Sequence, residues 1–163
     1  MPAPKLFGSP SVWSTPINRA TGGTASASSN PVSGEAAAKA FGGQTSTKWL
    51  GNMTGSGAWL QYQFAGSEAY AVTQYKITSA NDAPGRDPKN WSLLASNDGV
   101  NWTTLDTRTN QSFSGRFVTN TYTIANTTAY RYYRLSITAN NGSTETNLGG
   151  TGLVQLSELQ LLA

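Results

Sequence analysis

Apolar and polar residues alternate with a period of two over most of the chain, beginning near Trp59. The segment Trp59-Leu-Gln-Tyr-Gln-Phe64 is typical: every second side chain is apolar. This alternation is the pattern of a strand that is buried on one face. We predict strands over residues 59–64, 72–79, 91–95, 102–106, 116–124, 130–138 and 154–162. Between two of them, Asn97-Asp98-Gly99 is a hairpin signal.

Two segments depart from this pattern. Residues 34–41 are the only helical candidate and would make about two turns. Residues 1–27 hold four prolines and the pair Gly22-Gly23, and proline is excluded from helix interiors. We therefore predict an irregular leader, residues 1–23, packed on a body of residues 24–163, with Phe7 and Trp13 as its anchors.

Seven or eight short strands separated by turn-rich loops indicate an all-β sandwich or jelly roll of antiparallel strands. No internal repeat and no linker divides the chain, so we expect one domain. Three long polar loops lie at residues 42–57, 80–90 and 139–152, and shorter ones at 28–36 and 108–116. Loops displayed on a rigid sandwich are the expected place for function.

The composition argues against most enzymes. The 163 residues include no Cys and no His, which excludes disulfides, thiolate zinc sites, thiol nucleophiles and imidazole bases. Glycoside hydrolysis needs two facing carboxylates, and the chain has only 8 acidic residues. The loop carboxylates Glu35, Asp82, Asp87 and Glu145 leave such a pair open, but exposed carboxylates are more often solvated. We expect no catalytic activity.

The charge pattern also excludes partners. The formal net charge is +3, and no two of the 11 basic residues are adjacent, whereas nucleic-acid-binding proteins gather Lys and Arg on one face. No apolar run reaches the ~20 residues of a membrane span, and the first residues lack the apolar segment of a secretory signal. We therefore expect neither a nucleic-acid partner nor a membrane span.

Several motifs, in order, resemble the coagulation factor 5/8 type C, or discoidin, family over about residues 24–162. They are Thr24-Ala-Ser-Ala-Ser-Ser-Asn30, Ala40-Phe-Gly-Gly-Gln-Thr-Ser-Thr-Lys-Trp49, Trp59-Leu-Gln-Tyr62, Tyr75-Lys-Ile-Thr-Ser-Ala-Asn-Asp82, Trp91-Ser-Leu-Leu-Ala-Ser-Asn-Asp-Gly99, Trp102-Thr-Thr-Leu105, Tyr132-Tyr-Arg-Leu135 and Gln155-Leu-Ser-Glu-Leu159. The resemblance implies a galactose-binding-like β-sandwich of about eight strands. Pro84-Gly-Arg-Asp-Pro-Lys-Asn-Trp91 is most similar to bacterial family 32 carbohydrate-binding modules.

These relatives imply a non-catalytic, lectin-like module that binds a glycan or polysaccharide through loops at one end of the sandwich. We expect it outside the cell or at the cell surface, in a larger parent enzyme or a multivalent assembly. Animal relatives bind phospholipid head groups, collagen or other proteins, so a protein-interaction, adhesion or phospholipid-binding module is the alternative. Only Val32 and Phe113 are apolar at loop tips, which disfavours membrane binding.

Many family members hold a structural Ca²⁺ in the loop after Ala-Phe-Asp-Gly, where this chain reads Ala40-Phe-Gly42-Gly43. The ligand set that the resemblance implies is Lys39, Gln44, Thr47 and Glu158. Ca²⁺ prefers six to eight oxygens that include carboxylates, and Gly42 removes one of them. Whether the ion binds is left open; without it, Lys39 or Lys48 would balance the charge of Glu158.

The family topology implies that loops 28–36, 80–90 and 108–117 gather at one end. A sugar site needs planar bidentate groups beside an aromatic side chain. These loops supply the candidate ligand-binding residues Glu35, Asn81, Asp82, Arg86, Asp87, Phe113 and Arg116, with Asn30, Asn110 and Phe117 near them. In the alternative, Arg86 only braces its loop through Asp82 or Asp87, and Phe113 or Phe117 caps the core.

The tryptophans do not offer an obvious sugar platform. Trp59, Trp91 and Trp102 begin strands and Trp49 follows the implied ion loop, so we expect all four in the core. Loop 139–152 has no aromatic residue, and the chain has no His for a galactose contact. The identity of the sugar is therefore left open.

Overall fold

The computed structural model describes residues 14–163, which form ten strands and three short 3-10 helices. The strands are β1 (Thr24–Ala27), β2 (Trp49–Met53), β3 (Ala58–Gln63), β4 (Gln74–Thr78), β5 (Pro88–Ser96), β6 (Thr103–Arg108), β7 (Thr119–Thr123), β8 (Tyr132–Asn140), β9 (Gly152–Leu156) and β10 (Glu158–Leu162). The helices are η1 (Ser33–Glu35), η2 (Ala37–Phe41) and η3 (Pro84–Arg86). Within this part of the chain no helix is long and apolar enough to cross a membrane.

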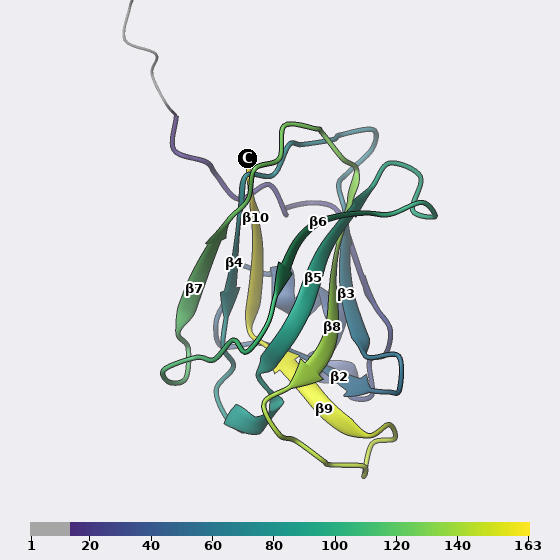
Figure 1. Ribbon diagram of the computed structural model, residues 1–163, viewed down its shortest axis with the longest axis vertical. Helices are drawn as coiled ribbons and strands as arrows, with labels where there is room; N and C mark the ends of the chain where they lie inside the picture. Colours follow the sequence, from purple (N-terminus) through teal and green to yellow (C-terminus); the bar gives the residue numbers. More distant parts are fainter. Residues whose placement is uncertain (1–13) are drawn as a thin grey trace, which may run out of the picture.

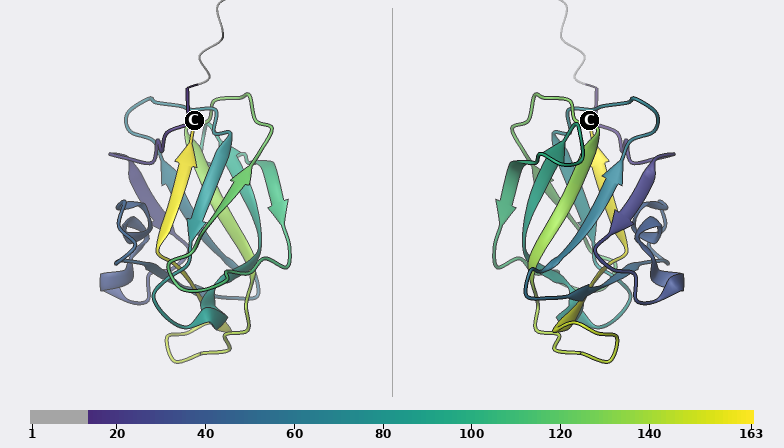
Figure 2. Two further views of the ribbon diagram at one scale, coloured as in Figure 1. Left: turned by 90° about the vertical axis from the view of Figure 1, so that its left-hand side faces the viewer. Right: turned by 90° about the vertical axis from the view of Figure 1, so that its right-hand side faces the viewer.

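The strands form two layers. A five-stranded sheet in the order β1-β3-β8-β5-β6 faces a three-stranded sheet in the order β10-β4-β7, and β2 pairs with β9 in a ribbon at the lower end (Figures 1 and 2). Every pair is antiparallel. The predicted all-β sandwich is confirmed, and β5 and β6 pair across the predicted Asn97-Asp98-Gly99 turn.

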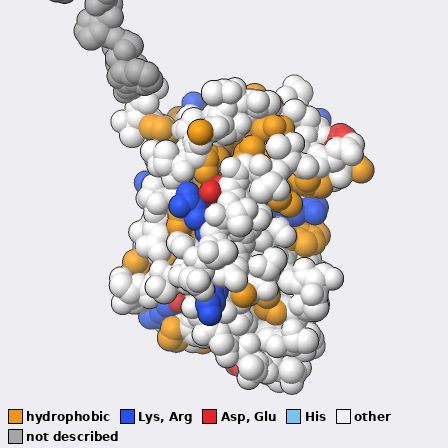
Figure 3. All heavy atoms as spheres, in the orientation of Figure 1, with side chains coloured by type: hydrophobic (Ala, Val, Ile, Leu, Met, Phe, Trp, Pro, Cys, Tyr) orange, Lys and Arg blue, Asp and Glu red, His pale blue; other side chains and the backbone are white. Residues whose placement is uncertain are grey.

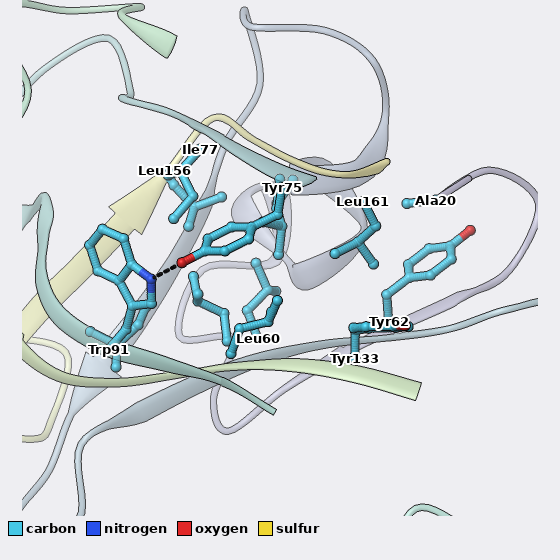
Figure 4. Packing of buried hydrophobic residues seen from close by; sticks show 14 of the residues in the cluster. Ala20, Leu60, Tyr62, Tyr75, Ile77, Trp91, Tyr133, Leu156 and Leu161 are labelled. Atoms are coloured by element: carbon cyan, nitrogen blue, oxygen red, sulfur yellow. Dashed lines mark hydrogen bonds between the residues drawn. The ribbon is translucent and has the colours of Figure 1, made fainter. Parts of the chain in front are cut away.

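The core lies between the two sheets and follows the period-two pattern. On β3, Leu60 and Tyr62 are buried, while Gln61 points outward. Figure 4 shows the indole of Trp91 pointing toward Tyr75 of the opposite sheet, and Trp91 Nε1 donates a hydrogen bond to the Tyr75 hydroxyl at 2.9 Å. A buried indole N–H needs such a partner. This bond therefore joins the two sheets through the core.

The tryptophan prediction is half right. Trp49 and Trp91 are buried, at 0% and 1% exposure. Trp59 and Trp102 are only partly buried, so their assignment to the core is wrong. Trp59 begins the outward-facing set of β3, and Trp102 lies just before β6. The first residue of an amphipathic strand can lie on its buried or its exposed face, so a position at the start of a strand does not predict that a tryptophan is buried.

Three predicted elements also differ. Residues 34–41 form η1 and η2 rather than an α-helix, because Ala36 between them is extended at ψ 166°. The single strand predicted over 154–162 is two strands in different sheets, divided at Ser157. The strand predicted over 116–124 begins only at Thr119, after Phe117 with φ +59°.

The leader prediction falls partly on residues 1–13, including Phe7 and Trp13, which lie outside the described residues. In the described part, Ile17 and Ala163 exchange backbone hydrogen bonds of 3.2 and 3.1 Å. Gly23 lies so close to β3 that a Cβ there would sit 2.2 Å from the Gln63 carbonyl oxygen. The segment before β1 is thus held by the C-terminal strand and by β3.

Candidate functional site

The loops before and after η3 and the loop between β6 and β7 meet at the lower end of the sandwich, beside the β2–β9 ribbon (Figure 1). Three non-glycine residues there have a positive φ: Ala83 at +42°, Asn110 at +53° and Phe117 at +59°. Left-handed conformations of such residues are uncommon and persist where the surroundings enforce them, often at binding sites. The strain therefore marks this end as a candidate site.

A pocket of about 230 Å³ opens at this end and is lined by Gly34, Glu35, Ser46, Thr47, Lys48, Asn81 and Asp82. The structure therefore brings together three predicted ligand-binding residues, Glu35, Asn81 and Asp82. It adds the hydroxyls of Ser46 and Thr47 and the ammonium group of Lys48. Every side chain in the lining is polar, so the pocket presents hydrogen-bond donors and acceptors.

Lys48 is the ionic centre of this pocket. Its Nζ lies 2.7 Å from Asp82 Oδ1 and 3.7 Å from Glu35 Oε1. Gln155, fully buried on β9, donates to the Asp82 carboxylate at 3.0 Å and to its backbone carbonyl at 2.7 Å. Burial raises the pKa of Asp82, but the bonds from Lys48 and Gln155 outweigh it and hold this pKa below its usual value. Asp82 is thus an ionised acceptor held in one orientation.

Arg116 braces the same loop from the other side. Its guanidinium forms a bidentate pair with Asp87, in which Nη1 donates to Oδ1 at 2.8 Å and Nη2 donates to Oδ2. Nη1 also donates to the Asp82 carbonyl at 3.0 Å. Hydrogen bonding to Asp87 raises the pKa of Arg116. Asp87 is only 2% exposed, so these two predicted residues support the site rather than line the pocket.

Arg86 makes a different pair from the one expected. Its Nε and Nη2 donate to the Glu145 carboxylate at 2.7 and 2.6 Å, and Ser143 also donates to that carboxylate. These bonds, from Arg86 first, lower the pKa of Glu145 to about 2. The alternative that Arg86 braces its loop through Asp82 or Asp87 is therefore wrong: the pair ties η3 to loop 139–152.

The two phenylalanine candidates separate clearly. Phe113 is partly buried and packs against the core, as the core-capping alternative held. Phe117 is 49% exposed and directly follows Arg116. Phe117 is therefore the more exposed of the two phenylalanines in this loop.

Other residues were missed or have structural roles. Lys48 and Gln155 belong to the hydrogen-bond network of the pocket, but the sequence carries no local signal of their partners. Asn30 accepts from the Ala37 amide at 2.9 Å and so supports η2, and Asn110 takes a turn conformation with φ +53°.

The residues of the implied calcium site lie together. The Thr47 hydroxyl is 3.1 Å from the Lys39 carbonyl oxygen and 3.3 Å from that of Gln44. Glu158 is 3% exposed, its Oε1 accepts from the Gly43 amide at 3.0 Å, and its buried Oε2 has no partner within residues 14–163. Burial raises the pKa of Glu158 to about 7. Two carbonyls, a hydroxyl and an unsatisfied carboxylate oxygen fit a hard cation.

Neither lysine offered as a substitute for the ion balances this charge. Lys48 pairs with Asp82 and Glu35 instead. Among the described ion pairs, none joins Lys39 to Glu158. No three acidic side chains gather within residues 14–163 either, so this loop would depend on carbonyl oxygens around a single carboxylate.

Comparison with known proteins agrees with this architecture. The family described as F5/8 type C domain matches residues 24–149. A peptide-N(4)-(N-acetyl-beta-glucosaminyl)asparagine amidase of Arabidopsis thaliana is 34% identical over 141 aligned positions, in an alignment that covers 83% of this chain and 20% of that protein. The chain thus spans about a fifth of the length of this relative.

Solved structures show the same fold. A CBM32 module from Clostridium perfringens in complex with GalNAc-β-1,3-galactose has a TM-score of 0.70 at 17% identity, covering 90% of this chain and 100% of that one. The family 32 module of C. perfringens NanJ in complex with galactose has a TM-score of 0.69 at 20% identity, covering 91% and 98%. A chitosan-binding module of Paenibacillus sp. IK-5 in complex with chitotriose has a TM-score of 0.67 at 22% identity, covering 90% and 100%.

Proposed function

The chain belongs to the F5/8 type C family and has the fold of CBM32 carbohydrate-binding modules, and from this premise we propose that it binds a glycan at the pocket between Glu35, Lys48 and Asp82. The observation that carries the proposal is this polar pocket. Carboxylates and an ammonium group bind vicinal sugar hydroxyls as acceptors and donors. The module itself performs no catalysis in this proposal.

The support around the pocket favours recognition by a preorganised surface. Gln155 and Arg116 both donate to the Asp82 backbone carbonyl, and Gln155 also donates to the Asp82 carboxylate. A group already held in its bound orientation loses less entropy when a ligand arrives. Phe117, exposed at the same end, is available to stack on the apolar face of a sugar ring.

A single shallow site of this kind binds weakly, and linkage to other modules would strengthen attachment through avidity. The similarity to part of a longer amidase supports a role as one module of a larger glycan-processing protein. Action outside the cell or at its surface stays a prediction.

A glycan array followed by calorimetry tests the pocket. The variants Asp82→Asn and Glu35→Gln remove the pocket carboxylates, and each should weaken binding at least about tenfold, the equivalent of one or two lost charged hydrogen bonds. Glu145→Gln is the matched control, because Glu145 lies at the same end but outside the pocket lining. Phe117→Ala tests the stacking contact.

The proposal would be refuted if the intact chain binds no glycan. It would also be refuted if Asp82→Asn binds a glycan as tightly as the intact chain does. A protein partner that competes for the same residues would then favour the interaction-module alternative. Binding to phosphatidylserine vesicles that depends on Phe117 would favour the phospholipid alternative.

We propose in addition that a structural Ca²⁺ is held by Glu158, Thr47 and the carbonyls of Lys39 and Gln44. The unpartnered Glu158 Oε2 supports this. Ca²⁺ should raise the melting temperature of the chelator-treated chain at pH 7.5 and leave Glu158→Gln unchanged. An equal midpoint with and without Ca²⁺ in the intact chain would argue against the ion.

A further inference from the structure

A second pocket, of about 300 Å³, lies apart from the Lys48 pocket and shares no residue with it. It is lined by Ser28, Ser29, Asn52, Thr54, Ser56, Gly57, Trp59 and Gly150. The Trp59 indole is the one aromatic group in this lining, and the other side chains carry four hydroxyls and one amide. Its volume is at the small end of the ~300–1,000 Å³ range of ligand pockets.

The polar groups of this pocket are held in place by the backbone but keep unused bonding capacity. Ser28 Oγ accepts from the Trp59 amide at 3.0 Å, and Ser29 Oγ accepts from the Asn52 amide at 2.8 Å. Within residues 14–163 neither hydroxyl donates to an acceptor, so both O–H groups remain available. Asn52 Nδ2 donates to the Leu148 carbonyl at 2.9 Å, while the buried Asn52 Oδ1 has no hydrogen-bond partner in the described part of the chain.

The indole wall is clamped from outside the pocket. The guanidinium carbon of Arg134 lies 4.4 Å from the ring centre of Trp59 and 4.1 Å from that of Trp102. Arg134 Nε and Nη2 both donate to Gln61 Oε1, at 2.9 and 2.7 Å. A cation this close to a ring centre lies over one face of the ring, so Trp59 is fixed before any ligand arrives.

This clamp sits on the outer face of the five-stranded sheet, since Gln61 and Arg134 are register partners on β3 and β8. Figure 3 shows hydrophobic and basic side chains next to one another at the right-hand edge of the front face, where Figure 1 places β3 and β8. Arg134 makes no ion pair among the described residues. Its guanidinium is therefore held by the two indoles and by the Gln61 amide oxygen rather than by a carboxylate.

Two glycines of the lining lie very close to the backbone of neighbouring strands. Gly57 has φ +81°, and a Cβ there would lie 2.2 Å from the Ile137 carbonyl oxygen. Gly150 also has φ +81°, and a Cβ there would lie 2.3 Å from the Met53 carbonyl oxygen. Such contacts allow only glycine, so these two residues let the lining approach the backbone of β8 and β2 closely.

We infer that this pocket is a second saccharide subsite that binds one neutral pyranose unit. Hydroxyl donors beside an amide acceptor match sugar hydroxyls, and the indole matches the C–H face of the ring. None of the described residues that line the pocket is charged, which favours a neutral sugar over an acidic one. The inference deepens the proposed glycan-binding function, but it stands on residues that the Lys48 pocket does not use.

The test is an NMR titration of the ¹⁵N-labelled chain with methyl β-galactoside, methyl β-glucoside, methyl α-mannoside and N-acetylglucosamine. We expect one of these sugars to shift the Asn52 and Trp59 amides and the Trp59 indole N–H. Trp59→Ala should weaken this binding at least about tenfold. Trp102→Ala is the matched control, because Trp102 stacks on Arg134 but does not line the pocket, and it should weaken binding less than about threefold.

A second variant tests the pocket in case Trp59→Ala does not fold. Ser56 is exposed and its side chain makes no hydrogen bond in the described part of the chain, so Ser56→Gln should keep the melting temperature while obstructing the pocket. An unchanged affinity in Ser56→Gln would overturn the inference.

The location of the shifts separates this inference from the proposed function. Shifts confined to Ser46, Asn81 and Asp82 would overturn the second subsite and leave the first pocket standing. Shifts confined to Asn52 and Trp59 would support the second subsite and count against the first. No shift at Asn52 or Trp59 with any of the four sugars would overturn the inference.

Discussion

The end of the sandwich that carries the candidate site holds two bidentate Arg–carboxylate pairs that differ in burial. In Arg116–Asp87 the carboxylate side chain is 3% exposed, whereas in Arg86–Glu145 it is 42% exposed. Asp87→Asn and Glu145→Gln each remove one charge and keep the side-chain shape. We expect the first to destabilise the protein far more than the second.

The magnitude follows from where the remaining charge is left. Removing one partner of a buried pair costs about 3–5 kcal/mol, because the other charge stays without compensation. The Arg116 side chain is 21% exposed and keeps its bonds to the Asp82 and Ala80 carbonyls. We therefore expect Asp87→Asn to lower the free energy of unfolding by about 2–3 kcal/mol. Glu145→Gln should lower it by less than about 1 kcal/mol, as for exposed pairs.

Urea and thermal unfolding at pH 7 measure both values, with the fluorescence of the buried Trp49 and Trp91 as the signal. For a domain of this size, the melting temperature should fall by about 4–12 °C in Asp87→Asn. Equal losses in the two variants would refute the reasoning, because both pairs are bidentate and the expected difference rests on the burial of the carboxylate.

Two further predictions follow from backbone geometry and from a buried carboxyl. Gly57→Ala should lower the free energy of unfolding by more than about 2 kcal/mol, because its Cβ would meet the Ile137 carbonyl oxygen at a positive φ. Gly55→Ala is the control, since a Cβ there would meet nothing within 4 Å. Urea unfolding measures both variants, and an unchanged stability in Gly57→Ala would contradict the structure. The folded-state pKa of Glu158 is raised from 4.5 to about 7, so the folded state holds a proton that the unfolded state has lost. In chelator, stability should therefore be full below pH 4.5 and fall by roughly 2–3 kcal/mol as the pH rises to about 7. Melting curves of Glu158→Gln should lack this fall; the same fall in that variant would assign it to another group.

The strands that pattern alone predicted correctly are those with a consistent period of two. In β3 and β8 each inward residue is apolar and each outward residue is polar or aromatic. β1 and β2 were not predicted. Thr24-Ala-Ser-Ala27 has only small side chains, and apolar and polar residues do not alternate in Trp49-Leu-Gly-Asn-Met53. β2 is buried on nearly every residue, and such a strand lacks a polar face to reveal it.

The candidate site divides in a similar way. Loops 80–90 and 139–152 were largely predictable because they are long, polar and placed between strands, but the polar loop predicted over 42–57 was wrong in part, since it contains the buried strand β2. Arg86 is adjacent to Asp87 and near Asp82 in sequence, yet its partner is Glu145, 59 residues away. Sequence proximity favoured the wrong ion pair because a turn of η3 directs neighbouring side chains to different loops.

The sequence by itself determined the all-β class, the antiparallel strands, the absence of His and Cys chemistry, and which loops are polar. These depend on residue identity and on a repeat of two, which are local properties of the chain. Only the tertiary structure decided that Lys48 meets Asp82 and Glu35, that Phe117 is exposed while Phe113 packs inward, and that Trp59 and Trp102 enclose Arg134 on the outer face of a sheet. Those contacts join residues tens of positions apart, and the packing of the two sheets, rather than any local pattern, brings them together.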